Sequence, residues 1–394
     1  MIHAQTDIPV IVLAAGEGIR LRPLTKYRPK PMLPAGTSPI LEHVLDALID
    51  CRLTDIRIVV GHRRARIQSY FGSQYRGVDL VYHTQEKQLG TGHALELADP
   101  PADRPCLVVY GDQIVDQSVI TDVVTQHDGD IATVGTIPGR DVRRYGGAIV
   151  ENGELRELVD RPTDDREYFL NAGVYVFEPA FMDAVANTGV SGGEQSVIDA
   201  IRSRLAADTP VGAVISDGFW VDATFPWDLL TITERLLERG HGESGTSESG
   251  PRIHEDAVVR EPVAIAPDCE IGPGAVIGPD TALGENVTVE ANAVVSRSVL
   301  DSDTRVGPNA TVIDVVTGIG ARIGAGSQIP GGPGDVRVDD RMFEGERLGA
   351  LLADRVVDRG GVTYHPGTMV GADSELGTGT VVRGSIDEGT IMGA

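Results

Sequence analysis

The sequence predicts two domains of different fold class, an α/β domain with a mainly parallel sheet and then a parallel β-helix. Over the first 238 residues, short runs rich in Val and Ile alternate with amphipathic helical segments, which is typical of α/β folds. After residue 252, aliphatic side chains recur at every sixth position, which is typical of a hexapeptide-repeat β-helix. We therefore expect domains at residues 1–238 and 253–394, joined by a linker at residues 239–252.

The predicted strands of the α/β domain are short, apolar and β-branched, and they occupy residues 8–14, 56–60, 78–82, 106–110 and 131–136. Helical patterns at residues 41–50 and 91–97 imply crossover connections between parallel strands. Ligands of such sheets bind at the carboxyl ends of the strands. We therefore expect chemistry in the segments that follow residues 14 and 110.

The repeat of the second domain is defined by its aliphatic positions, which slip by one residue at Leu300 and then resume. They are Ile265, Ile271, Ile277, Leu283, Val289, Val295, Leu300, Val306, Val312, Ile323, Ile329, Val370, Leu376 and Val382. Each should point into a prism-shaped core on which the next coil stacks, whereas a disordered tail has no reason to keep this spacing. Residues 331–361 interrupt the repeat, so we expect an excursion there. The linker is rich in Gly, Ser and acidic residues, which indicates flexibility.

The composition is strongly acidic, with 58 Asp and Glu against 34 Lys and Arg, and only three lysines occur. This balance is typical of proteins adapted to high salt, where ions screen the repulsion between carboxylates. It argues against nucleic acid as a partner, since phosphates would be repelled. Three widely spaced cysteines suggest neither a disulfide framework nor a zinc site. No signal-type start or run of about 18 apolar residues is present, so we expect a cytoplasmic protein without a membrane segment.

The first predicted strand runs directly into a loop with Gly16 and Gly18, and the cations Arg20 and Lys30 follow. Glycines let backbone N–H groups approach an anion, and fixed cations add charge where phosphates would lie. The loop is not a Walker A motif, because no Gly-Lys-Ser/Thr closes it, and it is a poor dinucleotide fingerprint. A plain glycine turn would not explain the prolines that brace the cations.

Residues 16–34 resemble the opening loop of the sugar-1-phosphate nucleotidylyltransferases, whose pattern is G-x-G-x-R-L-x-P-L-T-x-x-x-P-K-P-x-L-P. The resemblance implies a Rossmann-like nucleotidyltransferase domain. It further implies that Arg20 holds the nucleotide phosphates and that Lys30 contacts the reacting phosphates. Nucleotide-binding roles are implied for Leu13, Ala15, Gly16 and Gly18.

A second motif, residues 85–94, resembles the base-reading segment of the uridylyl- and thymidylyltransferases. The amide of Gln85 offers a donor and an acceptor, which match O4 and N3–H of uracil or thymine. Gly90 lets the backbone approach the base, and Thr91 belongs to the same segment. A Gly-Thr helix cap is the competing interpretation, but it does not explain Gln85.

Two aspartates are candidate ligands of Mg²⁺. Asp112 follows a buried strand, and Asp222 lies in residues 220–224, which resemble the family's W-x-D-x-G-T segment with Ala223 in place of glycine. Two carboxylates and phosphate oxygens suit Mg²⁺, although either aspartate alone could belong to a surface turn.

Three further segments resemble the family's sugar pocket. Gly146 would present backbone to the sugar, and Asn171 would offer an amide to its hydroxyls. Asp160 and Arg161 stand where the family has E-K-P, so Asp160 is one methylene shorter while Arg161 could still grip the sugar phosphate, and we count it with the catalytic residues.

The implied reaction is an attack by a hexose-1-phosphate oxygen on the α-phosphorus of UTP or dTTP, with release of pyrophosphate. The repeats resemble left-handed hexapeptide β-helices, which pair around threefold axes, so we expect a trimer or a multiple of one. The two-domain plan also resembles the archaeal bifunctional N-acetylglucosamine-1-phosphate uridylyltransferases and glucosamine-1-phosphate acetyltransferases, yet residues 310–320 lack the histidine segment of their acetyl-transfer step. A non-catalytic regulatory scaffold is a third hypothesis, which the retained cations and carboxylates oppose.

Overall fold

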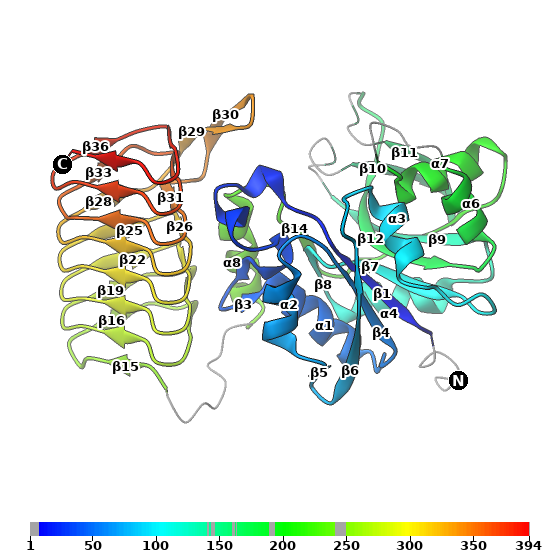
Figure 1. Ribbon diagram of the computed structural model, residues 1–394, viewed down its shortest axis with the longest axis horizontal. Coiled ribbons are helices and arrows are strands. Elements are labelled where there is room, and N and C mark those ends of the chain that lie inside the picture. Colours follow the sequence, from blue (N-terminus) through cyan, green and yellow to red (C-terminus); the bar gives the residue numbers. More distant parts are fainter. Residues whose placement is uncertain are drawn as a thin grey trace. The chain divides into compact units, whose positions relative to one another are not determined.

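The computed structural model describes residues 8–139, 142, 146–159, 162, 164–188, 194–240 and 250–393. They form two compact units (Figure 1). The first unit contains the chain up to Glu17, then Pro29–Met32 and Ile40–Asp222. The second contains Gly18–Arg28, Leu33–Pro39 and the chain from Ala223 onward. The segment with the predicted phosphate-binding cations is thus divided between the two units.

A ten-stranded sheet forms the centre of the first unit, in the order β10-β11-β13-β9-β12-β7-β1-β4-β6-β5. Its strands are β1 (Val10–Ala14), β4 (Ile56–Val60), β5 (Gln74–Tyr75), β6 (Val78–Thr84), β7 (Cys106–Tyr110), β9 (Ala132–Pro138), β10 (Gly147–Glu151), β11 (Glu154–Val159), β12 (Phe169–Phe177) and β13 (Gly212–Ile215). Described helices of this unit are α1 (Ile40–Asp50), α2 (Arg64–Phe71), α3 (Thr91–Leu97), α4 (Gln117–Gln126), α6 (Phe181–Asn187) and α7 (Val197–Ala206). A smaller sheet pairs β8 (Gln113–Val115) with β14 (Trp220–Asp222).

Both faces of the large sheet are buried around β1, because successive residues of a strand point to opposite sides. Val10 and Val12 belong to an apolar core that includes residues of α1, α2 and α4. Ile11 and Leu13 belong to a second core that includes residues of α3, α6 and α7. A strand buried on both faces needs an unbroken apolar run, which explains the sequence of β1.

The predicted parallel pairing is present where β1 lies between β4 and β7, and where β6 follows β4. The sheet as a whole is mixed rather than mainly parallel, because β12 lies antiparallel between β7 and β9, and β10 pairs antiparallel with β11. The apolar residues of β12, most of which are buried, carry no signal for strand direction, so the pattern could not predict this insertion. The prediction of an α/β domain followed by a parallel β-helix is confirmed.

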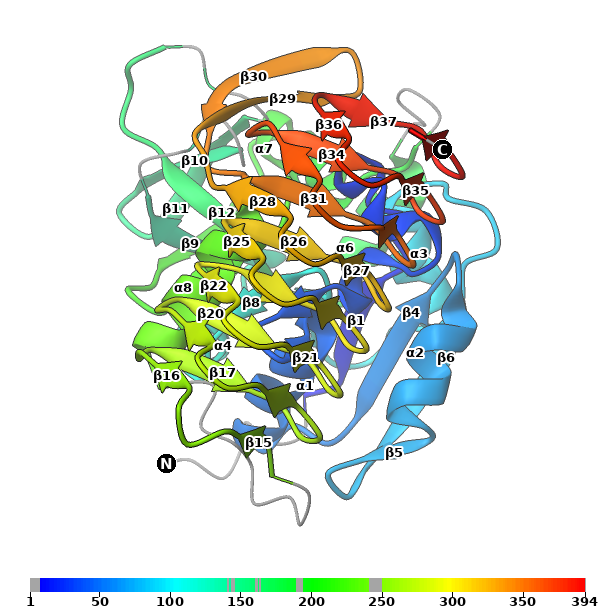
Figure 2. The same ribbon diagram turned by 90° about the vertical axis from the view of Figure 1, so that its left-hand side faces the viewer.

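The β-helix makes up most of the second unit, and its strands stack in three sheets, coil upon coil (Figure 2). The first sheet has β15 (Arg252–Ile253), β18 (Glu270–Ile271), β21 (Thr288–Val289), β24 (Arg305–Val306), β27 (Arg322–Ile323), β32 (Val357–Asp358), β35 (Glu375–Leu376) and β38 (Ile391–Met392). The second has β16 (Val258–Val259), β19 (Val276–Ile277), β22 (Val294–Ser296), β25 (Thr311–Ile313), β28 (Gln328–Pro330), β33 (Thr363–Tyr364) and β36 (Val381–Val382). The third has β17 (Val263–Ile265), β20 (Thr281–Leu283), β23 (Val299–Leu300), β26 (Val315–Thr317), β31 (Ala350–Leu352), β34 (Thr368–Val370) and β37 (Ser385–Ile386).

Other elements of the second unit precede the β-helix in the chain. They are the 3₁₀ turns η1 (Ile19–Leu21) and η2 (Leu24–Lys26), the strands β2 (Pro34–Ala35) and β3 (Ser38–Pro39), and the helix α8 (Asp228–Glu238). A third 3₁₀ turn, η3 (Lys30–Met32), belongs to the first unit. None of the helices in the described parts of the chain is long and apolar enough to cross a membrane.

All the aliphatic residues that define the predicted repeat lie in the buried core of the β-helix. The excursion is shorter than predicted: the chain leaves the coils after Pro330, forms a hairpin of β29 (Gly334–Val338) and β30 (Arg341–Glu346), and returns at Ala350. The inner positions of the next coil hold Asp358 and Tyr364, whose side chains share a 3.0 Å hydrogen bond inside the core. These polar residues interrupt the aliphatic spacing and so hide the repeat.

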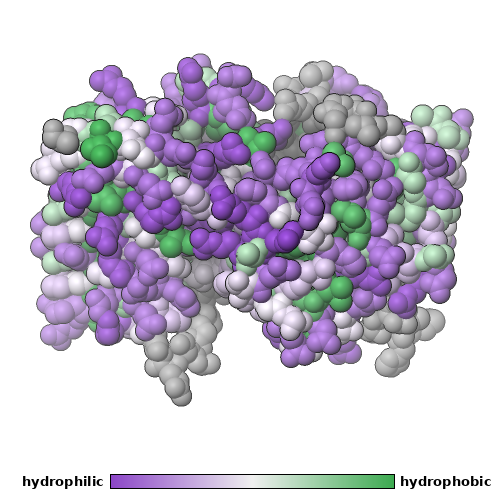
Figure 3. Space-filling model, in the orientation of Figure 1, coloured by the Kyte–Doolittle hydropathy of each residue, from purple (hydrophilic) through white to green (hydrophobic). Residues whose placement is uncertain are grey.

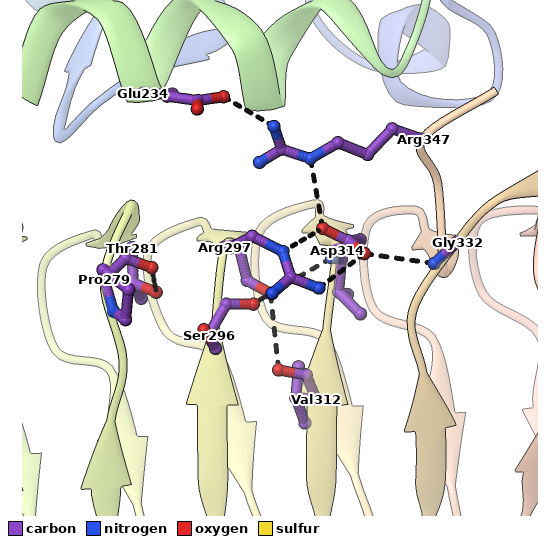
Figure 4. Close-up of polar contacts among 11 residues, drawn as sticks. Glu234, Pro279, Thr281, Ser296, Arg297, Val312, Asp314, Gly332 and Arg347 are labelled. Atoms are coloured by element: carbon purple, nitrogen blue, oxygen red, sulfur yellow. Dashed lines mark hydrogen bonds and ion pairs between the residues drawn. The ribbon is translucent and has the colours of Figure 1, made fainter.

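A buried carboxylate joins the coils to α8 (Figure 4). Asp314 accepts hydrogen bonds from Nε of Arg297 at 2.9 Å, Nε of Arg347 at 3.2 Å and the N–H of Gly332 at 3.1 Å. Arg347 also donates to Glu234 of α8 at 2.5 Å. Burial would raise the pKa of Asp314, but these donors and the charge of Arg297 lower it. The network therefore holds α8 on the β-helix with paired charges rather than with apolar contacts alone.

Candidate active site

A cleft of about 300 Å³ opens beside the carboxyl ends of β1 and β7 in the first unit. Its lining residues are Leu13, Ala15, Gly16, Gln85, Gln88, Gly90, Thr91, Ala94, Tyr110, Asp112, Glu194 and Ser196. The cleft brings together the predicted nucleotide-binding residues of the first unit and one predicted metal ligand. The predicted residue Gly18 belongs to the second unit.

Gln85 is only 4% exposed, and its side-chain amide is fixed by two internal contacts. Its Nε2 donates to the carbonyl of Gly90 at 2.9 Å and contacts Nδ1 of His93 at 3.0 Å. Because the amide nitrogen can only donate, Nδ1 of His93 is the acceptor. Both amide hydrogens are used in this way. The group that Gln85 can offer to a ligand is therefore its oxygen, which accepts a hydrogen bond.

The backbone at Gly90 is one that only glycine can adopt there. Its φ is +97°, and a Cβ would lie 2.7 Å from the backbone nitrogen of Gln195 and closer still to its carbonyl oxygen. The N–H of Gly92 donates to the same carbonyl at 2.8 Å. The hydroxyl of Thr91 accepts from the N–H of Val197 at 3.0 Å, which links α3 to α7. This segment is thus held in a single shape at the wall of the cleft.

Lys30 lies between the two predicted metal ligands. Its Nζ is 2.8 Å from Oδ2 of Asp112 and 3.0 Å from Oδ1 of Asp222. Asp112 follows the strand β7, and β14 pairs Asp222 with Gln113, so the two strands bring the carboxylates together. Burial would lower the pKa of Lys30, but the two carboxylates outweigh burial and raise it above its ordinary value. Lys30 is therefore a permanently charged ammonium at this point.

The same two carboxylates fit a divalent cation, because they already converge on one positive charge and are hard oxygen donors. Their side chains are 31% and 19% exposed, so the oxygens are accessible. Among the described residues there is no group of three or more His, Cys, Asp or Glu side chains that could hold a metal. A Mg²⁺ ion held by Asp112 and Asp222 would thus complete its ligands with phosphate oxygens and water.

The remaining predicted residues do not line the cleft or are outside the described residues. Arg20 is exposed in η1 of the second unit. Asn171 lies in β12, where its Nδ2 donates to the hydroxyl of Tyr175 at 2.8 Å. Gly146 precedes β10, with φ +88°. Asp160 and Arg161 lie outside the described residues, so their predicted sugar and phosphate contacts stay predictions.

Sequence reasoning missed several residues of the cleft wall. Gln88 donates to the carbonyl of Ala15 at 3.3 Å, and it could have been found because it lies inside the second motif. Tyr110 precedes Gly111-Asp112, and its hydroxyl pKa is raised by burial. Glu194 and Ser196 come from a distant segment that carries no motif, so no signal in the sequence pointed to them.

The chain that carries this cleft on a mixed α/β sheet is a nucleotidyltransferase. The sequence model of the nucleotidyl transferase family matches residues 9–239, and the chain belongs to that family. A second model, described as the GMPPB C-terminal domain, matches residues 259–387. The relatives include a UTP--glucose-1-phosphate uridylyltransferase, and the chain is an enzyme of the sugar-1-phosphate nucleotidyltransferase class, for which a nucleoside triphosphate and a sugar-1-phosphate are the substrates.

The similar proteins include one-domain and two-domain relatives. The UTP--glucose-1-phosphate uridylyltransferase AglF of Haloferax volcanii is 32% identical over 234 residues, which cover 58% of this chain and 96% of the relative. A bifunctional protein GlmU of Methanococcus maripaludis is 32% identical over 404 residues, covering 97% and 96%. A solved structure described as a glucose-1-phosphate thymidylyltransferase from Bacillus anthracis is 26% identical, with a TM-score of 0.52, and covers 57% of this chain and 93% of its own.

Proposed function

We propose that this enzyme transfers UMP or dTMP from UTP or dTTP to a hexose-1-phosphate and releases pyrophosphate. The contacts of Gln85 support the choice of uracil or thymine over cytosine. Its amide hydrogens are used internally, so its oxygen can only accept, and N3–H of uracil or thymine is the matching donor. Cytosine has no hydrogen on N3 and would place two acceptors against each other.

The chain's own residues act by positioning and by charge. Lys30 presents an ammonium to the reacting phosphates, and Arg20 adds a second cation for the nucleotide phosphates. Arg161 grips the sugar phosphate, while Gly146, Asp160 and Asn171 hold the sugar. Since the attacking phosphate oxygen is already anionic, the reaction needs no side-chain nucleophile.

We propose that the cofactor is Mg²⁺, held by Asp112 and Asp222. When bound, it offsets the charge that develops on the phosphates and brings two anions together. The closeness of the two carboxylates supports this assignment, because a pair of oxygen donors around one positive charge is what a phosphate-bound Mg²⁺ requires.

The test is pyrophosphate release from a panel of nucleoside triphosphates and sugar-1-phosphates, in about 2 M KCl with and without Mg²⁺. We expect turnover with UTP or dTTP and none with CTP. Turnover with CTP at the same rate would contradict the role of Gln85, and turnover with a purine triphosphate at the same rate would contradict the proposed choice of a pyrimidine nucleotide. Activity that survives chelation of divalent cations would contradict the metal site.

A second candidate activity is acetyl transfer by the β-helix. The match to a bifunctional protein over 97% of this chain favours it. Residues 310–320 carry no histidine, however, and strands β25 and β26 occupy most of that segment. Release of free coenzyme A from acetyl-CoA and glucosamine-1-phosphate would establish this activity, and its absence at enzyme concentrations that saturate the first assay would exclude it.

We further propose a trimer, or a multiple of one, assembled through the β-helix, in a cytoplasm of high salt. The second sheet of the β-helix, which runs from β16 to β36, supports this. One outward side chain from each of its strands is uncharged: Val258, Val276, Val294, Thr311, Gln328, Thr363 and Val381. The neighbouring sheet instead presents charges, such as Arg252 paired with Glu270. An uncharged face lets subunits with a net charge of −24 meet without direct repulsion.

The assembly can be tested by light scattering. Val276→Arg should lower the mass of the oligomer, because it buries a charge in the contact. Thr288→Arg is the matched control, since it adds the same side chain to an outward position of the charged sheet. A wild-type monomer would refute the proposal, and equal behaviour of the two variants would show that the contact lies elsewhere.

On the face shown in Figure 3, hydrophilic residues predominate and apolar residues are scattered, so this face shows no large apolar patch.

A further inference from the structure

Arg28 lies in the glycine loop, residues 16–34, yet it has no role in the proposed reaction. Its side chain is only 5% exposed and forms ion pairs with Asp301 and with Asp354, the second at 3.1 Å. The two carboxylates are 273 and 326 residues away in the sequence. All three residues belong to the second compact unit. A fully charged guanidinium is expensive to bury, so its place among two carboxylates needs an explanation.

The carboxylates are themselves fixed by the β-helix. Asp301 directly follows β23, and it accepts from the N–H of Ser302 at 2.7 Å. Asp354 follows β31 and accepts from the N–H of Ile319 at 3.1 Å. In the sheet, β26 is the one strand between β23 and β31, so the guanidinium joins two coils that have one further coil between them. Arg28 is therefore held by two carboxylates that are themselves hydrogen-bonded to the backbone of the β-helix.

The residues before Arg28 make contacts of the same kind. The hydroxyl of Tyr27 donates to Asp373 at 3.1 Å, and the guanidinium of Arg355 lies 4.7 Å from the centre of the Tyr27 ring. Nζ of Lys26 is 3.0 Å from Glu388. All three contacts are exposed, and each contributes little. Together they show that residues 26–28 follow the coils as one segment.

This segment is continuous with the phosphate-binding residues. The hydroxyl of Thr25 donates to the carbonyl of Gly18 at 2.8 Å, which closes the turn that carries Arg20. On the other side, only Pro29 separates Arg28 from Lys30, and its ring fixes the backbone φ. The chain passes from the second unit into the first between Arg28 and Pro29. A displacement of Arg28 would consequently be transmitted to both cations.

We propose that Arg28 is a positioning residue for nucleotidyl transfer, which with Asp301 and Asp354 ties the glycine loop to the β-helix. The β-helix thus takes part in the reaction of the other domain as the support of its phosphate-binding loop, although it supplies no catalytic group. This inference rests on the proposed function for the roles of Arg20 and Lys30. It predicts that removing these carboxylates of the β-helix together with Arg28 lowers kcat/KM for the nucleotide.

The test uses the full chain and three variants. Arg28→Met removes the cation, and the triple variant Arg28→Met/Asp301→Asn/Asp354→Asn removes all three charges, so that no buried charge is left unpaired. Glu375→Gln is the matched control, because it removes a β-helix carboxylate whose partner is the exposed Arg359. For each protein we would measure kcat, the KM of each substrate, and hydrogen exchange of residues 18–28.

We expect kcat/KM for the nucleotide to fall by about 10- to 100-fold in the first two variants, while their KM for the sugar-1-phosphate stays unchanged. The control Glu375→Gln should keep wild-type kinetic constants. Arg28→Lys should restore part of the loss, and exchange in residues 18–28 should become faster. Wild-type kinetics and exchange in the triple variant would overturn the proposal, as would an equal loss of affinity for both substrates. If the wild-type protein itself released no pyrophosphate, the proposed function would fail, and the exchange of residues 18–28 would still decide whether Arg28 anchors the loop.

Discussion

Replacing Lys30 by methionine tests the centre of the proposed site, because it removes one positive charge and keeps most of the apolar stem. Two carboxylates would then face each other without a counter-ion. Breaking a buried charge cluster costs about 3–5 kcal/mol, and we expect the lower value because the side chain of Asp112 is 31% exposed. Mg²⁺ should restore much of this stability by replacing the lost charge. The melting temperature of Lys30→Met should therefore rise more with added Mg²⁺ than that of the wild type.

The same variant should lose catalysis even when Mg²⁺ has restored its stability. Loss of a charged contact to the transition state costs about 100-fold or more in kcat. Pyrophosphate release at saturating Mg²⁺ measures this loss, and thermal melts with and without Mg²⁺ measure the first effect. Lys87→Met is the control, since Lys87 is an exposed lysine outside the cleft wall. A near-wild-type kcat in Lys30→Met would refute the role of this lysine. If Mg²⁺ raised the melting temperatures of Lys30→Met and of the wild type equally, the metal site would be refuted.

Three further predictions concern the base site and a buried carboxylate. Gln85→Glu should lower kcat/KM for UTP and dTTP by about 10-fold or more, because a carboxylate cannot donate to the Gly90 carbonyl, and steady-state kinetics would show it. Gly90→Ala should lower the melting temperature and raise the KM for the nucleotide, since its Cβ would overlap Gln195. Gly129→Ala separates the two causes, because Gly129 has a similar φ of +98° but open space around it, so it should cost less. Asp314→Asn should be most destabilising near neutral pH. The pKa of Asp314 is lowered in the folded state, so its stabilisation is present above the ordinary value near 4 and is lost below it, and urea unfolding at several pH values should show the gap to wild type closing.

The β-helix could be predicted well because stacked coils require aliphatic side chains at regularly spaced inner positions. Ile271, Ile277 and Val295 are buried in the core where the spacing placed them. The repeat could not be detected where Asp358 and Tyr364 occupy inner positions. Their side chains share a hydrogen bond in the core, which the spacing of aliphatic residues does not reveal. The antiparallel strand β12 escaped prediction for a related reason, because apolarity encodes burial but not direction.

The site was predictable where residue type and chemistry coincide within one motif. Lys30, Asp112 and Asp222 were each identified as candidates, and the strands bring them into contact. The sequence could not show that His93 and the Gly90 carbonyl use the amide hydrogens of Gln85, because that depends on the fold of residues 85–93. Contacts over hundreds of residues, such as those of Arg28, are set by the stacking of the coils and leave no local signal.

The stacked coils also determine which part of the β-helix opens first. In such an array each coil contacts only its neighbours, so stability is a sum of nearest-neighbour terms and unfolding begins at the ends. The last strand begins with the exposed Ile391, and Glu388, the partner of Lys26, lies three residues before it in the chain. Asp301 and Asp354 lie in interior coils that are covered on both sides. Fraying at the carboxyl end would thus release the exposed lysine pair first, while the buried arginine would keep its partners until the middle of the array unfolds.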